Sequence, residues 1–227
     1  MDKIRNGIRV INCDTRSSTV RSVELWPDIT RACLLGGSGC GKTNAMITIL
    51  LHRKPLRSVY LCSRTADQEK YLLLKELVEK HNEKHRSNEK KIKLVEVSLE
   101  KLPVPEQVDW DSVVIFDDLL VEKAQDKIAA FFMRGRHRGI SCFYLSQSYT
   151  KIPKKTGIRE NFNYLILFKQ DLINLRQIYA EHISDISFEK FRDLCRKCWA
   201  EKYSFLVVDL ESERSRFKKN FEYEFRL

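Results

Sequence analysis

The sequence lacks a long apolar run, since none of its hydrophobic stretches approaches the ~18 residues that a membrane-spanning helix needs. It also lacks the even cysteine set of a disulfide framework. It holds seven cysteines, and three of them, Cys33, Cys62 and Cys142, fall inside apolar runs that are typical of strands. Internal repeats and low-complexity linkers are absent too. These absences predict one packed core in a reducing, intracellular compartment, with no membrane partner.

Acidic residues are the minority among the charged ones, because 31 Asp and Glu against 41 Lys and Arg give a net charge of +10. A field of this sign attracts polyanions, and charge alone does not choose between nucleic acid and an anionic membrane. Cys195 and Cys198 form a single C-x-x-C pair. Without a second pair or a histidine couple nearby, we expect buried or helix-surface thiols there rather than a metal site.

A glycine-rich stretch, Gly36–Thr43, fits the Walker A pattern G-x-x-x-x-G-K-[ST]. The apolar run Ala32–Leu35 precedes it and the helical run Asn44–His52 follows it, which is the strand and helix context that the pattern requires. Glycines let successive backbone N–H groups converge on phosphates at a helix N-terminus. The pattern therefore predicts that ATP binds at Gly37, Ser38, Gly39, Cys40, Gly41, Lys42, Thr43 and Asn44.

Within this loop, Lys42 is expected to reach the β- and γ-phosphates, and the Thr43 hydroxyl to ligate Mg²⁺. A second acid follows at the end of a buried strand, where four apolar residues lead into Asp117 and Asp118. This is the Walker B form: Asp117 would hold the Mg²⁺ through water, and Asp118 would orient or deprotonate the attacking water. Gln147 follows the next apolar strand, so it would reach the same sheet edge and sense the γ-phosphate or position the attacking water.

Phosphoryl transfer also needs an extra cation, commonly an arginine from a neighbouring subunit. Arg134, Arg136 and Arg138 cluster after the predicted helix at 122–133, and Arg159 follows a basic segment. Each one taken singly is more often a surface arginine. As a group, they predict that one of them is this catalytic arginine, the arginine finger.

Strands that alternate with helices predict an α/β fold: a mostly parallel sheet sandwiched by helices. We expect residues 1–29 to pack on the sheet edge with candidate strands at 8–12 and 20–25. Residues 30–210 would form the P-loop domain and 211–227 a charged tail. The other expected strands span 58–62, 93–97, 112–116, 140–145, 164–168 and 203–208, and the other expected helices span 66–81, 171–182 and 187–201.

Two basic segments are the candidates for contact with a nucleic acid backbone. One is the solvated block 81–93, which contains Lys90 and Lys91; the other is 151–161, expected to be mobile, which contains Lys151, Lys154 and Lys155. Both would contact phosphates rather than bases, so binding should weaken steeply with added salt.

Taken together, these residues resemble the FtsK–HerA superfamily of P-loop motors, and more closely the genome-packaging ATPases of poxviruses, giant viruses, virophages and Polinton/Maverick elements. The resemblance rests on Gly36–Thr43, on Ile115–Asp118, on Arg136–Ser141 leading to Gln147, and on Ile158–Asn161. It implies a RecA-like (ASCE) core in a homo-oligomeric ring, a pentamer or hexamer, that pumps double-stranded DNA into a capsid through a capsid or portal protein. It would act in the host cytoplasm, virus factory or nucleus. Asp118 departs from the more general Glu of the superfamily.

Two other functions remain open. A nucleotide or small-molecule kinase also has a P-loop, and the region from Arg134 to Lys155 could imitate its arginine-rich lid. A DNA-binding scaffold that uses ATP as an assembly switch would bind nucleotide without turnover. The position of Gln147 favours an ATPase over the kinase, and the intact Asp117–Asp118 pair argues against the scaffold.

Overall fold

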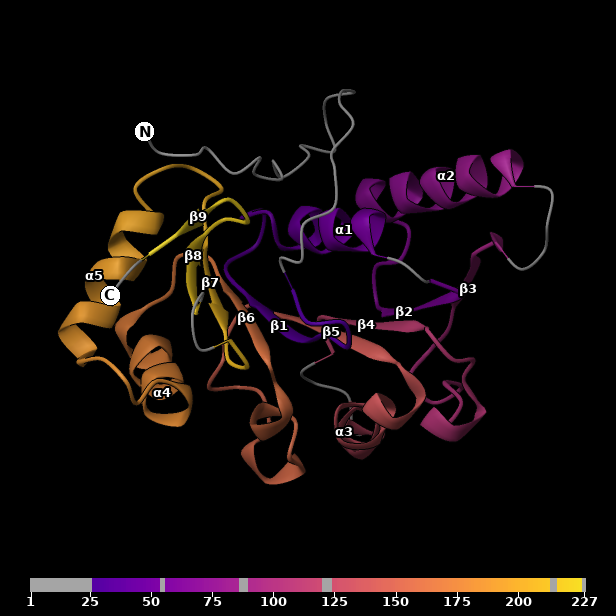
Figure 1. Cartoon of the computed structure of the whole chain (residues 1–227). Helices are drawn as coiled ribbons and strands as arrows, with labels where there is room; N and C mark the ends of the chain where they lie inside the picture. Colours follow the sequence, from indigo (N-terminus) through magenta and orange to yellow (C-terminus); the bar gives the residue numbers. More distant parts are fainter. Residues whose placement is uncertain (1–25, 54–55, 86–89, 120–123, 213–215, 226–227) are drawn as a thin grey trace.

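The computed structural model describes residues 26–53, 56–85, 90–119, 124–212 and 216–225. The strands predicted at 8–12 and 20–25 lie outside these residues. Within the described part of the chain, nine strands form one sheet in the order β3-β2-β4-β5-β1-β6-β7-β8-β9 (Figure 1). The first six strands run parallel, as predicted, and they are β1 (Arg31–Leu35), β2 (Ser58–Ser63), β3 (Lys93–Glu96), β4 (Val113–Asp117), β5 (Ser141–Ser146) and β6 (Tyr164–Leu167).

Helices cover both faces of this sheet (Figure 1). Successive residues of β1 serve opposite faces: Ala32 and Leu34 belong to the apolar core beneath α1 and α2, whereas Cys33 and Leu35 belong to the core beneath α3, α4 and α5. A strand buried on both sides must be continuously apolar, which is why β1 shows no polar alternation. The helices are α1 (Lys42–His52), α2 (Glu69–Lys84), α3 (Gln125–Arg134), α4 (Leu172–His182) and α5 (Phe188–Cys198).

The last three strands are antiparallel, and two of them, β8 and β9, lie in the segment that was predicted to be a charged tail. β7 (Leu206–Asp209) pairs with β6, and β8 (Phe217–Lys219) and β9 (Tyr223–Glu224) extend the same sheet. Phe217 and Phe221 are buried in the two cores. The prediction that 211–227 lies outside the domain is therefore wrong for residues 216–225, which complete the sheet.

The segment predicted to be mobile, 151–161, is also well packed. Ile152 and Ile158 are fully buried in the core beneath α3, α4 and α5. Two short 3-10 helices, η4 (Lys154–Thr156) and η5 (Arg159–Asn161), carry the chain from β5 back to the start of β6. The lysines of this segment therefore lie on a well-packed connection between β5 and β6, called the crossover below.

Several smaller expectations can be compared with the fold. Cys195 and Cys198 are buried on α5, as expected, and among the described residues no group of three or more His, Cys, Asp or Glu could hold a metal ion. From the N-terminal extension, Trp26 packs edge-on against Phe221 and His52. In the parts of the chain that the structure describes, no helix is both long and apolar enough to cross a membrane.

Candidate nucleotide-binding site

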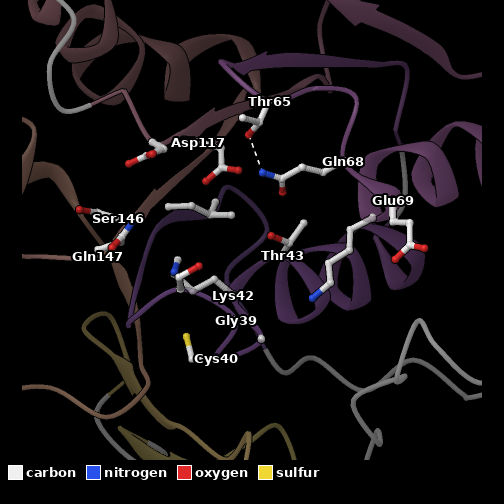
Figure 2. Close-up of a pocket in the computed structure, with 15 residues that line it drawn as sticks. Gly39, Cys40, Lys42, Thr43, Thr65, Gln68, Glu69, Asp117, Ser146 and Gln147 are labelled. Carbon is white, nitrogen blue, oxygen red and sulfur yellow. Dashed lines mark hydrogen bonds between the residues drawn. The ribbon is translucent and has the colours of Figure 1, made fainter.

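The register of the parallel strands brings the predicted motifs together. Leu35 pairs with Ser146, and Asp117 lies between Leu145 and Ser63 in the neighbouring strands, so β1, β2, β4 and β5 end at the same level. A cavity of about 570 Å³ opens at this carboxyl edge (Figure 2). Its lining contains the predicted residues Ser38, Gly39, Cys40, Gly41, Lys42, Thr43, Asp117, Asp118 and Gln147.

Glycines shape the loop between β1 and α1. Gly39 and Gly41 have φ values of 70° and 110°, in the left-handed region that side chains disfavour. At Gly36, a Cβ atom would lie 2.5 Å from Cys40 Sγ and 2.7 Å from Phe168 Cβ, so no larger residue fits without displacing the loop. The conformation of the loop therefore depends on these glycines.

Lys42 is the first residue of α1, and its side chain turns back along the loop. Its ammonium group donates hydrogen bonds to the carbonyl oxygens of Gly36, at 2.7 Å, and Gly37, at 2.9 Å. The free N–H groups at the start of α1 and the helix dipole add positive character to the same end of the cavity. The site thus suits an anion that is coordinated by backbone amides and one lysine.

Asp117 is linked to the glycine loop by the side chain of Tyr71, a residue that the sequence did not identify as part of the site. Tyr71 on α2 is fully buried, and its hydroxyl donates a 2.6 Å hydrogen bond to Asp117 Oδ2 and also hydrogen-bonds Thr43. Burial raises the pKa of the Asp117 carboxyl, although the hydrogen bond from Tyr71 and the charge of Lys42 oppose this. One phenol oxygen therefore places the Thr43 hydroxyl and the Asp117 carboxylate side by side.

These two oxygen groups fit the expected Mg²⁺, because that ion prefers hard oxygen ligands and is bound by few carboxylates together with phosphates and water. Tyr71 then corresponds to the outer partner that orients a ligating carboxylate. Figure 2 shows Lys42 and Thr43 on the loop side of the cavity, across from Asp117.

Asp118 and Gln147 both line the cavity and are exposed to solvent. Asp118 has a left-handed backbone with φ of 55°, and its N–H donates to the carbonyl of Leu145 at 3.3 Å. Such a conformation costs a non-glycine residue about 1 kcal/mol or more, and it turns the side chain out of the strand direction. The structure therefore brings both predicted water-orienting groups to the same cavity as the glycine loop.

Other polar residues of the cavity come from the turn between β2 and the start of α2. Gln68 donates a 2.6 Å hydrogen bond to Thr65 Oγ1, and the lining also includes Glu69 and Lys70. A signal for them existed in the sequence: polar residues follow the buried strand β2, as Asp117 and Gln147 follow theirs. Tyr71 gave no such signal, because it belongs to the apolar stripe of α2.

The arginine cluster lies away from the cavity. Arg134 ends α3 and forms a 3.0 Å ion pair with Glu106, and Arg138 donates to the Val108 carbonyl. Arg136 is exposed between them in η3 (Gly135–Arg138). Since η3 precedes the first residue of β5, these arginines lie at the amino edge of the sheet, opposite the cavity of their own chain.

Arg159 does not match its predicted role as a finger. Its residue is only 5% exposed, and its guanidinium donates to the carbonyls of Thr150 and Ile152, both at 2.7 Å. It also pairs with Glu181 at 3.2 Å. A group fixed by these buried contacts cannot extend into a neighbouring subunit, so the structure assigns Arg159 to the interior.

The basic candidates for DNA contact are exposed but separated. Lys90 and Lys91 lie between α2 and β3, next to Ile92 of the α1–α2 core. On the crossover that packs into the opposite core, the exposed lysines are Lys151, Lys154 and Lys155. The two groups therefore belong to opposite faces of the sheet.

Solved structures share this fold. B204, the DNA-packaging ATPase from Sulfolobus turreted icosahedral virus, matches with a TM-score of 0.54 and 16% identity over 86% of this chain and 97% of that chain. VirB4 of Thermoanaerobacter pseudethanolicus matches with a TM-score of 0.54 and 11% identity over 90% and 93%. B204 from Sulfolobus turreted icosahedral virus 2, a genome packaging NTPase solved in complex with ATP-gammaS, matches with a TM-score of 0.52 and 16% identity over 86% and 97%. At these identities, the likeness concerns the fold.

Comparison with curated proteins gives no match. The family model described as Poxvirus A32 protein matches residues 20–209. This range contains the glycine loop, the paired aspartates and Gln147, and it covers most of the 227 residues. The chain therefore belongs to the Poxvirus A32 protein family.

Proposed function

We propose that this protein hydrolyses ATP in a ring of identical subunits and uses the energy to move double-stranded DNA into a viral capsid. The observation that carries the proposal is the single cavity in which the glycine loop, Lys42 and the Asp117–Asp118 pair meet. A triphosphate in the loop would take the Lys42 ammonium from the carbonyls of Gly36 and Gly37, which it now contacts.

The residues of the cavity divide the chemistry between them. Thr43 and Asp117, held together by Tyr71, would hold Mg²⁺, which when bound supplies charge neutralisation between the β- and γ-phosphates. Asp118 orients the attacking water and accepts its proton. Gln147 hydrogen-bonds the water or a γ-phosphate oxygen from the end of β5.

The additional cation comes from another subunit. Arg134 and Arg136 lie at the amino edge, and we assign the finger to Arg136 because Arg134 is already paired with Glu106. From this edge, Arg136 reaches a neighbour's cavity rather than its own. This is the reason to expect a ring in which the amino edge of one copy faces the carboxyl edge of the next.

The DNA substrate is supported by the net charge of +10, by the exposed lysines, and by membership of the Poxvirus A32 protein family. The structurally similar B204 is described as a DNA-packaging ATPase. A packaging motor acts at a capsid or portal, so we propose such a protein as partner, inside the infected cell.

The kinase alternative loses its proposed lid. Arg134 and Lys155 line a second cavity of about 430 Å³ between α3 and the crossover, and this cavity shares no residue with the nucleotide site. The basic residues at the two ends of the region that could have imitated a lid, Arg134 and Lys155, therefore lie away from the phosphates, and only its middle part, with Gln147, lines the nucleotide cavity. The scaffold alternative requires a protein that binds ATP without hydrolysing it. Asp118 and Gln147, the two residues that we propose to act on the attacking water, lie in the cavity, so the site favours hydrolysis over binding alone.

The test is phosphate release from ATP, with and without duplex DNA and without any acceptor substrate. We expect DNA to stimulate the rate, and we expect Lys42→Ala and Asp118→Asn each to reduce it at least 100-fold, because each removes a group that acts on the transition state. A rate that DNA does not change, and that survives both substitutions, would refute the motor. Turnover that appears only with an added acceptor would indicate the kinase.

A further inference from the structure

The loop that follows Gln147 is hydrogen-bonded to α4 through Asn174 near the start of the helix, and through the Tyr149 hydroxyl to Glu181 and His182 near its end. Asn174 Oδ1 accepts hydrogen bonds from the Ser148 hydroxyl at 3.1 Å and from the Thr150 backbone N–H at 3.0 Å. These residues are one and three positions after Gln147. Asn174 itself is only 5% exposed, whereas Ser148 is half-buried and Thr150 is exposed, so the contacts are partly shielded from water.

The orientation of this amide is set from its other side. Asp171, the N-cap of α4, accepts the Asn174 backbone N–H at 2.8 Å and its side-chain Nδ2 at 2.9 Å. Because a carboxylate accepts hydrogen bonds, Nδ2 must face Asp171 and Oδ1 must face the loop. At the start of α4, the Asn174 Oδ1 atom is thus oriented to accept hydrogen bonds from the loop that follows Gln147.

A second anchor lies further along the same loop. Arg159 donates to the carbonyls of Thr150 and Ile152 at 2.7 Å and pairs with Glu181 near the end of α4. The loop is therefore held by residues near both ends of helix α4. This use of Arg159 also explains why it is buried.

The Gln147 side chain depends on this support. It is exposed, and among the residues that the structure describes it has no hydrogen-bond partner. Its direction is therefore set by the backbone on both sides of it, where the Ser146 hydroxyl donates to the Ser148 carbonyl and accepts from the Ser148 N–H, and where Asn174 holds the residues that follow. A misplacement of about 1 Å of a catalytic group can cost on the order of 100-fold in rate.

We infer that Asn174, turned by Asp171, is the positioning residue that holds Gln147 toward the reacting phosphate, with the Arg159–Glu181 pair as its second anchor. The inference rests on the proposed ATP hydrolysis and on the role of Gln147 in it. It adds α4 to the catalytic apparatus, although no residue of that helix lines the nucleotide cavity.

The test compares Asn174→Ala with Asn163→Ala in the full-length protein. Asn163 is a matched control: it is 2% exposed and fixes the backbone of Ile29 and Arg31, but at the amino edge of the sheet. Two quantities are measured: hydrogen exchange of the Thr150 amide, and kcat and KM for ATP. Ser148→Ala, which removes one of the two hydrogen bonds to Asn174 together with the 3.1 Å contact between the Ser148 and Thr150 hydroxyls, is the milder variant if Asn174→Ala folds poorly.

We expect Asn174→Ala to speed exchange at Thr150 about tenfold and to lower kcat about tenfold with KM for ATP within twofold, and Ser148→Ala to lower kcat less. Asn163→Ala should change neither quantity, even if it loses as much thermal stability. The inference is overturned if exchange at Thr150 stays at the wild-type rate, which can be measured whether or not the protein hydrolyses ATP. It is also overturned if kcat is unchanged in Asn174→Ala although Gln147→Ala lowers it. If Gln147→Ala is as active as wild type, the role of Gln147 fails together with the inference, while the Lys42→Ala result still decides the proposed function.

Discussion

Replacing Tyr71 by phenylalanine removes one oxygen atom from the site and leaves the packing of α2 intact. That oxygen contacts both Asp117, at 2.6 Å, and Thr43. Tyr71 is fully buried, so water cannot easily take the place of the lost hydroxyl. The substitution therefore frees the two groups that we propose as metal ligands without altering either of them.

The magnitude follows from two independent estimates. A hydrogen bond to a charged group contributes roughly 1.5–3 kcal/mol. Loss of an outer partner of a metal ligand typically costs about 10–100-fold in metal affinity or activity, which is about 1.4–2.7 kcal/mol. We therefore expect Tyr71→Phe to raise the Mg²⁺ concentration needed for half-maximal ATP hydrolysis by about 10–100-fold.

The assay is ATP hydrolysis at fixed ATP over a titration of Mg²⁺, together with thermal unfolding. Tyr144→Phe is the matched control, because Tyr144 is also fully buried but its hydroxyl has no hydrogen-bond partner among the residues that the structure describes. This control should keep the wild-type Mg²⁺ requirement and should be as stable as wild type or slightly more so. An unchanged Mg²⁺ requirement in Tyr71→Phe would show that Tyr71 does not organise the site.

Three further predictions follow. Gly36→Ala should destabilise the fold by about 1–3 kcal/mol, because the added methyl collides with its neighbours, whereas Gly37→Ala, whose Cβ meets nothing within 4 Å, should not; urea unfolding compares them. Burial lowers the pKa of His182 from 6.5 to about 4, so the unfolded chain binds the extra proton in that range and stability should fall by up to about 3 kcal/mol from pH 6.5 to 4. His182→Phe should flatten this decline, and an equally steep decline would contradict the assignment. Replacing Lys151 and Lys154 by alanine should weaken duplex binding and reduce the slope of log K against log salt by about 0.9 per lysine, and an unchanged slope would place DNA elsewhere.

The parts of the site that the sequence reveals are those that local rules determine. Glycines with left-handed backbones, a lysine at a helix start and acids at the end of an apolar strand each have a signature within a few residues. Parallel strands then bring Thr43, Asp117 and Gln147 to one edge, so the cavity could be predicted without coordinates.

The parts that the sequence missed depend on tertiary contacts. Tyr71 has the spacing of a core residue, and it becomes part of the site only because the fold brings its hydroxyl to Asp117 at the end of β4. Arg159 follows lysines in a polar stretch, and only the fold shows that Glu181 and two carbonyls surround it. The strands β8 and β9 are short and charged, so their pattern is weak, and pairing with β7 stabilises them.

The central claim is that nucleotide turnover in the cavity moves the protein along duplex DNA. Its most direct test is displacement of a third strand from a DNA triplex at the end of a long duplex, since only a protein that translocates along the duplex strips that strand. We predict ATP-dependent displacement by the wild-type protein and none by Lys42→Ala at equal DNA occupancy. Vigorous ATP hydrolysis by wild-type protein that leaves the third strand in place would contradict the account.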